Sequence, residues 1–237
     1  TGTDCSFFSE AVEAANQSEL VIAAIGERAS MSGEDASRAD ISIPGVQEEL
    51  VQALLDTGKP VVVVLMNGRP LTISKLTEQV PAIVEGWFLG TETGNAIADV
   101  LLGKYNPSGK LTMSFPRNVG QIPVFYNYRQ SGRPGTDKLT KWTNRFIDSP
   151  VSPLYPFGYG LSYTTFSYSA PRVSQKEFST NEILKVSVDV TNTGQYDGEE
   201  TIQLYIRDVI ASVTRPVKEL KGFEKIFPKA GESKKVS

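Results

Sequence analysis

Two acidic residues, Glu27 and Glu34, are the candidates in this chain for proton transfer by a carboxyl group. Glu27 directly follows a continuous apolar run at residues 20–25, which is typical of a strand buried on both faces. It would then lie at the carboxyl end of a parallel strand, the edge where open α/β sheets gather ligands. The polar loop at residues 28–38 carries Glu34 and could present a carboxyl group to a partner surface. By residue type alone, a glutamate after a strand is more often a solvated charge or a helix cap.

The residue types that are absent restrict the chemistry further. The 237 residues include no His, so this chain alone cannot assemble a Ser-His-Asp triad, a His general acid or a His-ligated zinc site. A single cysteine, Cys5, allows no internal disulfide and no Cys-rich metal cluster. Proton transfer then rests on carboxylates, Lys and Tyr. We expect no cofactor and no metal ion.

Charge and hydropathy exclude several kinds of partner. The net charge is −3, so there is no basic surplus to neutralise a nucleic acid, and we expect no nucleic-acid partner. The longest apolar run, residues 61–66, is far shorter than the roughly 20 residues that cross a bilayer, so we expect no membrane span. The stretch at residues 108–111 resembles the end of a phosphate loop, but Leu111 stands where Ser or Thr should hold magnesium. The chain opens without Met or an apolar signal core, as expected of a mature product or an excised piece.

Strand and helix patterns alternate in the first part of the chain. The patterns predict strands at residues 20–25, 61–65 and 82–88, and helices at residues 10–18, 44–58 and 93–102. The last helix should face inward with Ala96, Ile97, Val100 and Leu101. Residues 61–65 should form the central strand. A turn at residues 67–70 should lead into a helix, with Pro70 at its first position. This order predicts an α/β fold with an open, mostly parallel sheet flanked by helices, over residues 1–116.

The rest of the chain changes character twice. Residues 117–160 are rich in Pro, Gly and Tyr and predict an irregular connecting arm. Residues 161–237 show strand alternation at 184–190 and 202–206, each with one dry face, and turn signals between them. This spacing suggests a β-sandwich of the fibronectin III sort. There is room for about five strands where such a sandwich needs about seven, so we expect the sandwich to be incomplete and the chain to stop before this domain is finished.

Three stretches resemble a known enzyme family. Residues 84–111 read VEGWFLGTETGNAIADVLLGKYNPSGKL, residues 154–166 read LYPFGYGLSYTTF, and residues 215–224 read RPVKELKGFE. Together they resemble glycoside hydrolase family 3: its second domain, the junction that follows, and its fibronectin III-like third domain. The resemblance runs through nearly the whole chain and is nearest in character to periplasmic β-glucosidases, which implies a periplasmic or secreted protein.

The resemblance implies a retaining, exo-acting mechanism in which two carboxyl groups flank a β-glycosidic bond. In this family the nucleophilic Asp lies on a preceding (β/α)8 barrel, which this chain lacks, and the acid/base Glu comes from the second domain. Gly26-Glu27 is the best match for that Glu, and we favour Glu27, with Glu34 as the competitor. Met31 and Ser32 in the same loop are candidate sugar contacts.

A general acid near neutral pH needs a carboxyl pKa raised from about 4.3 toward 6. An exposed loop cannot supply this alone, so the barrel must help by burial and by its negative nucleophile. We therefore expect the chain alone to be inactive. The implied partners are that barrel and a β-linked oligosaccharide or aryl β-glucoside; a β-xylosidase of the same family is equally compatible. A non-catalytic carbohydrate-binding or scaffolding protein is the alternative of another class.

Overall fold

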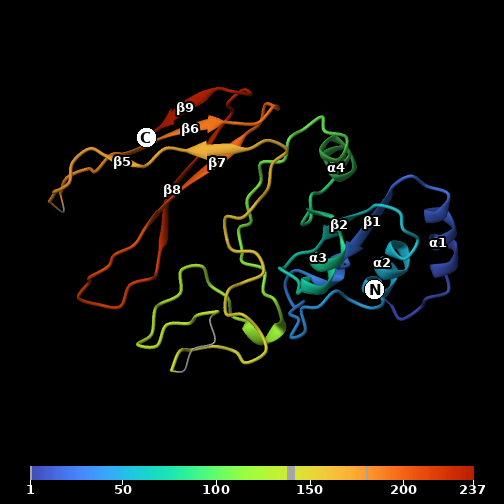
Figure 1. Ribbon diagram of the computed structural model, residues 1–237. Helices are drawn as coiled ribbons and strands as arrows, with labels where there is room; N and C mark the ends of the chain where they lie inside the picture. Colours follow the sequence, from blue (N-terminus) through green and yellow to red (C-terminus); the bar gives the residue numbers. More distant parts are fainter. Residues whose placement is uncertain (1, 138–141, 180) are drawn as a thin grey trace. The chain divides into compact units, whose positions relative to one another are not determined.

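The computed structural model describes residues 2–137, 142–179 and 181–237 (Figure 1). These residues form two compact units that interleave along the chain. The first unit comprises Thr1–Ile97, Met113–Tyr126 and Gly132–Pro156, and the second comprises Ala98–Thr112, Asn127–Ser131 and Phe157–Ser237. The division into residues 1–116, 117–160 and 161–237 stays a prediction, because the two units are defined by compactness and not by sequence order.

The first unit is built on a parallel sheet of three strands in the order β1-β2-β3. The strands are β1 (Val21–Gly26), β2 (Val61–Met66) and β3 (Ala82–Glu85). Between them run the helices α2 (Gln47–Leu55) and α3 (Ser74–Gln79), and α1 (Phe8–Asn16) precedes β1 (Figure 1). Short 3-10 turns lie at η1 (Ala29–Met31) and η2 (Val119–Gln121). The expected α/β class and the parallel pairing are confirmed.

The core of this unit is centred on β2. Val61, Val63 and Leu65 have no exposed surface, and β2 is the central strand, between β1 and β3. The register pairs Gly26 with Met66 and Leu65 with Glu85. The carboxyl ends of all three strands therefore meet at one edge of the sheet.

Two expectations about helices need correction. No helix begins at Pro70; α3 begins at Ser74, after an extended segment in which Ser42 and Thr72 form a parallel bridge. The backbone there pairs with another segment, which a helix starting at Pro70 would prevent. The helix α4 (Thr93–Leu101) forms, but none of its residues is buried, and the expected inward residue Ala96 is exposed.

The second unit contains antiparallel strands in two sheets. In the first sheet β6 (Val186–Asn192) pairs with β4 (Phe166–Tyr168), β5 (Arg172–Val173) and β9 (Ser233–Val236). In the second, β7 (Glu200–Ile206) pairs with β8 (Glu219–Ile226), with a register shift between Leu204 and Tyr205. The described residues thus form six strands where about five were expected, and the antiparallel character is confirmed.

The expected dry face of β7 is wrong beyond its first half. Ile202 is buried, but Leu204 and Ile206 are 37% and 48% exposed. The register shift interrupts the alternation. A buried carboxylate links the two sheets instead: Glu200 on β7 accepts a hydrogen bond from the Tyr168 hydroxyl at 2.7 Å and pairs with Lys110 at 3.1 Å.

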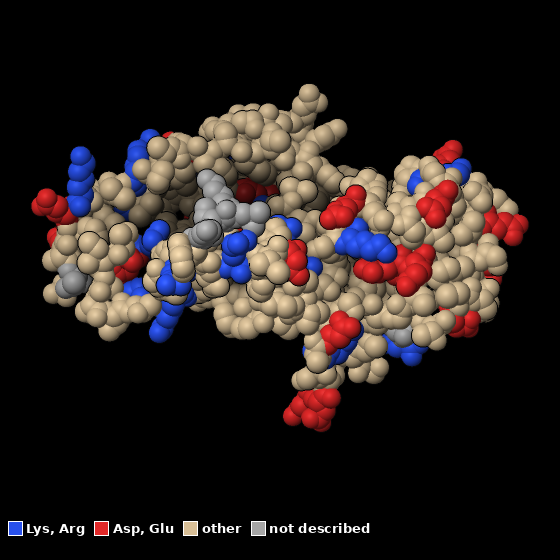
Figure 2. Space-filling view, turned by 60° about the horizontal axis from the view of Figure 1, so that its bottom comes forward, with Lys and Arg blue, Asp and Glu red and all other residues tan. Residues whose placement is uncertain are grey.

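Two general properties of the chain concern its charged surface and its helices. Figure 2 shows acidic and basic side chains close to one another on the viewed face. Within residues 2–137, 142–179 and 181–237, no helix has the length and apolar character that crossing a membrane requires.

Candidate active site

The site is built where β1 ends against β2. Gly26 has a φ of +135°, and a Cβ placed there would lie 1.9 Å from the Met66 carbonyl oxygen, so only glycine fits. The Gln47 side chain holds this glycine on both sides, accepting from its N–H at 2.8 Å and donating to its carbonyl at 2.9 Å. The next residue, Glu27, donates its N–H to the Met66 carbonyl at 2.8 Å. The backbone thus fixes where the Glu27 side chain starts.

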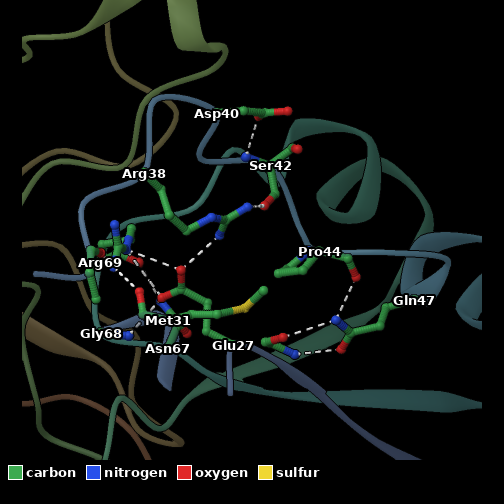
Figure 3. A network of polar contacts seen from close by, with 12 residues as sticks. Glu27, Met31, Arg38, Asp40, Ser42, Pro44, Gln47, Asn67, Gly68 and Arg69 are labelled. Carbon is green, nitrogen blue, oxygen red and sulfur yellow. Dashed lines mark hydrogen bonds and ion pairs between the residues drawn. The ribbon is translucent and has the colours of Figure 1, made fainter. Parts of the chain in front are cut away.

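The Glu27 carboxylate lies between two guanidinium groups (Figure 3). Arg38 Nη1 donates to Oε1 at 2.7 Å, and Arg69 Nε lies 3.0 Å from Oε1 and 3.3 Å from Oε2. The Gly68 N–H donates to Oε2 at 3.1 Å. The Glu27 side chain has no exposed surface, while those of Arg38 and Arg69 are 18% and 19% exposed. We name Glu27, Arg38 and Arg69 the guanidinium cluster.

The guanidinium cluster joins two loops at the sheet edge (Figure 3). Arg38 Nη2 donates to the Ser42 carbonyl at 2.9 Å. Arg69 Nη2 donates to the carbonyls of Met31 and Ala36, the latter at 2.9 Å. Arg69 follows β2, whereas both carbonyls belong to the loop after β1, so one side chain spans the two loops.

Glu34 has the opposite surroundings. It is exposed and lies in a tight turn that the Ala36 N–H closes by donating to the Gly33 carbonyl at 3.3 Å. Gly33 and Asp35, on either side of Glu34, have positive φ values of 117° and 61°. Positive φ at the third position is the requirement of a type II turn, which leaves the second position, here Glu34, at the tip. The structure therefore separates the two candidates: Glu27 is enclosed and Glu34 projects.

Met31 and Ser32 lie between these two glutamates and are half-buried. Ser32 packs tightly against the loop after β2, since a Cβ on Gly68 would lie 1.9 Å from Ser32 Oγ and 2.9 Å from Phe88 Cε2. Loops that follow all three strands thus meet here. Sugar contacts by Met31 and Ser32 stay a prediction.

A third carboxyl group, Glu85, was not singled out from the sequence. It ends β3, and its Oε1 accepts from the Trp87 N–H at 3.0 Å. Glu85 Oε2 and Asn67 Oδ1 are the buried side-chain oxygens without a hydrogen-bond partner in the described part of the chain. Burial raises the pKa of Glu85 to about 8, and the bond from the Trp87 N–H and the nearby Asn67 side chain lower it by less. The signal was a carboxyl group inside an apolar strand pattern, directly after Val84.

The described residues offer no obvious metal centre. Across residues 2–137, 142–179 and 181–237, no group of three or more His, Cys, Asp or Glu side chains is placed to hold a metal ion.

Comparison with protein families assigns the larger part of the chain. Residues 5–163 match the glycosyl hydrolase family 3 C-terminal domain. The chain belongs to glycosyl hydrolase family 3. Residues 200–237 match the fibronectin type III-like domain, which agrees with the resemblance drawn from the sequence.

Curated relatives in this family are named for action on β-glycosides. The chain is 54% identical over 233 residues to a periplasmic beta-glucosidase of Salmonella typhimurium, covering 98% of this chain and 30% of that protein. It is 49% identical over 230 residues to a beta-xylosidase of Formosa agariphila, covering 97% and 31%. The chain thus spans about 30% of the length of these family 3 relatives.

Solved structures agree with this assignment. The family 3 chain superposes on a beta-glucosidase of Listeria innocua, crystallised in complex with glucose, with a TM-score of 0.93 and 44% sequence identity. The match covers 100% of this chain and 33% of the Listeria chain. The relatives accordingly contain further chain that this sequence does not include.

Proposed function

We propose that this chain is part of a retaining, exo-acting β-glucosidase and supplies its general acid/base, Glu34. The proposal draws on the family membership and on the names of the relatives, and the periplasmic relative supports a periplasmic or secreted location. The observation that carries it is the placement of Glu34 at the tip of an exposed turn beside the carboxyl edge of the sheet. The nucleophile would come from a barrel domain outside this chain.

The proposed reaction needs two carboxyl groups about 5–5.5 Å apart across the β-glycosidic bond. The nucleophilic carboxylate attacks the anomeric carbon and forms a glycosyl ester, while Glu34 gives its proton to the departing glycosidic oxygen. Glu34, now a carboxylate, takes a proton from water as the water oxygen attacks the anomeric carbon of the glycosyl ester and breaks its bond to the nucleophile's carboxylate oxygen. This step releases the sugar and restores the nucleophile and the protonated Glu34.

We assign this role to Glu34 in preference to Glu27 on geometry. A general acid must come within hydrogen-bond distance of the oxygen that it protonates. Both oxygens of Glu27 already accept hydrogen bonds, from Arg38, Arg69 and the Gly68 N–H. The Glu27 side chain is also fully enclosed. Glu34 has no such constraint, because the loop presents it outward. The initial preference for Glu27 stays an untested prediction, against which its burial argues.

The sugar at the reacting position is the second part of the proposal. Terminal β-D-glucosyl residues are the first choice, in line with the beta-glucosidase relatives. A β-xylosidase activity is the alternative, because a beta-xylosidase is 49% identical to this chain. The barrel would hold most of the sugar, so assays of the full-length protein with aryl β-glucosides and aryl β-xylosides distinguish the two.

The test replaces each glutamate in the full-length protein. We expect Glu34→Gln to lower kcat/KM for a β-glucoside with a poor leaving group by about 10²-fold or more, the contribution of general acid catalysis. A dinitrophenyl glucoside needs no proton on its leaving group, so its kcat/KM should change little. Azide needs no general base, so it should restore kcat of Glu34→Ala and yield a β-glucosyl azide.

Glu27→Gln is the matched comparison in the same assays. If Glu27→Gln shows the selective loss and azide rescue in its Ala variant, while Glu34→Gln does not, the acid/base role moves to Glu27. If the full-length protein hydrolyses neither type of glycoside, the proposal of an enzyme is overturned in favour of a carbohydrate-binding or scaffolding protein.

A further inference from the structure

We propose that Arg69 is a positioning residue that sets the place of the Glu34 carboxyl group, with Glu27 holding Arg69 in turn. The inference rests on the proposed function of Glu34. Arg69 lies 35 positions further along the chain, in the loop after β2. The link between them is a set of hydrogen bonds to the backbone of the loop that carries Glu34.

The two carbonyls that Arg69 holds stand on either side of the turn. The Met31 carbonyl lies before the turn, which starts at Gly33. The Ala36 carbonyl lies at its end, because Ala36 is the last residue of the turn and its N–H closes the turn. A single planar guanidinium group therefore fixes the start and the end of the segment with Glu34 at its tip. Figure 3 shows Arg69 directed from its own loop towards Met31 and Glu27.

The Glu34 carboxyl group has no polar partner that could fix it in the described part of the chain: no hydrogen bond or ion pair involves it, and the residue is exposed. The position of that group thus depends on the backbone of the turn, and the backbone depends on Arg69. A displacement of about 1 Å in a catalytic group can cost roughly 10²-fold in rate.

Glu27 orients the guanidinium group for this task. Arg69 uses Nε for the Glu27 carboxylate and Nη2 for both carbonyls, which exploits the rigid fork of arginine donors. Lysine has one nitrogen and a flexible stem, so it can keep the charge but not the three directions at once. Arg69→Lys therefore keeps the positive charge beside Glu27 but removes the hydrogen bonds that position the Glu34 turn.

The experiment measures kcat/KM of the full-length protein for aryl β-glucosides whose phenols span a wide range of pKa. We expect Arg69→Lys and Arg69→Met to lose about 10-fold to 10²-fold on poor leaving groups and little on dinitrophenyl glucoside, because only protonation by Glu34 is impaired. Arg28→Met is the control: Arg28 is an exposed arginine in the loop that carries Glu34, and it lies outside the guanidinium cluster. This variant should keep the wild-type dependence of kcat/KM on the pKa of the leaving phenol. Hydrogen exchange of amides 31–36 should be faster in Arg69→Lys than in the wild type.

The outcomes distinguish this inference from the proposed function. Two results for the Arg69 variants overturn the positioning role and leave the function of Glu34 intact, provided that Glu34→Gln shows the selective loss. One is an equal loss of kcat/KM on all leaving groups. The other is a wild-type dependence of kcat/KM on leaving-group pKa in both variants. If Glu34→Gln shows no selective loss, both proposals fall. Should Arg69→Met not fold, the Glu27→Gln/Arg38→Met/Arg69→Met triple variant, which replaces all three charged groups of the guanidinium cluster by neutral ones, gives the same comparison beside Arg69→Lys.

Discussion

Glu27 and Glu34 are seven residues apart and carry the same functional group, but their surroundings differ. The Glu27 carboxylate is enclosed and compensates two positive charges, so its contribution is to the structure of the loop. Within the described residues, the Glu34 side chain makes no hydrogen bond or ion pair, and that loop presents it to solvent. Chemistry at this edge would depend on both: one residue would act and the other would hold the frame.

Removal of the Glu27 charge should destabilise the protein. We expect Glu27→Gln to lower the free energy of unfolding by about 3–5 kcal/mol, because it leaves two guanidinium groups at a largely buried position without a counter-charge. Urea denaturation of the full-length protein measures this. Glu34→Gln is the control and should change stability by less than about 0.5 kcal/mol, since Glu34 is exposed. Equal effects of the two substitutions would contradict the structural role of Glu27.

Glu85 should make stability depend on pH. Its pKa is raised from 4.5 to about 8 in the folded protein, first by burial. Between these pH values the unfolded chain has released the proton and the folded chain retains it, so stability falls as pH rises through this window, by up to about 1.4 kcal/mol per pH unit.

Glu85→Gln should remove this pH dependence. The glutamine side chain cannot ionise, so it stays neutral at every pH in this window. We therefore expect the variant to gain stability over the wild type progressively from pH 5 to pH 8, as measured by urea denaturation at each pH. Parallel pH profiles for the two proteins would show that Glu85 keeps no raised pKa.

The sequence could place Glu27 at the end of a strand but could not reveal its neighbours. Its position followed from the apolar run that precedes it, and the structure has β1 end there. Arg69 is 42 residues away, and it meets Glu27 because the register aligns Gly26 with Met66. Register and side-chain reach are properties of the folded sheet, so no local pattern could distinguish an enclosed Glu27 from an exposed one.

At the scale of elements, β2 stabilises the sheet on which the site is built. Its residues are apolar throughout, and Leu65 has no exposed surface. We expect Leu65→Ala to lower the free energy of unfolding by about 2–5 kcal/mol through lost burial and a residual cavity. Leu20→Ala is the same change at a residue that is 48% exposed, and it should cost less than about 1 kcal/mol. Urea denaturation compares them; similar costs would contradict the central place of β2.

Elements with a strong local pattern could be predicted, and those that depend on their partners could not. The run at residues 61–65 had strand composition and became the central strand, because apolar β-branched side chains favour burial on both faces. Pro70 is compatible with a helix start, but the bridge between Ser42 and Thr72 takes that segment into extended structure. The alternation of β7 predicted a dry face, which the shift after Leu204 interrupts.

At the scale of the whole molecule, the chain should be inactive by itself. It spans about 30% of the length of its curated relatives, and the proposed nucleophile is not among its residues. We expect residues 1–237, produced alone, to show no turnover of an aryl β-glucoside above the level of their own Glu34→Gln variant. Circular dichroism must show that both samples are folded. Turnover by the wild-type chain that the variant lacks would mean that a complete catalytic pair lies within these residues.

The interleaving of the two units limits how this protein can be dissected. Residues 98–112 belong to the second unit, where Ser108 and Tyr105 donate to Glu199 at 2.9 and 2.6 Å, and Lys110 pairs with Glu200. A truncation after residue 116 would remove Glu199 and Glu200 and leave these donors facing solvent. The backbone passes between the units at five places, so no single scission yields two intact halves, and a hybrid protein would need five matched crossover points to exchange either unit.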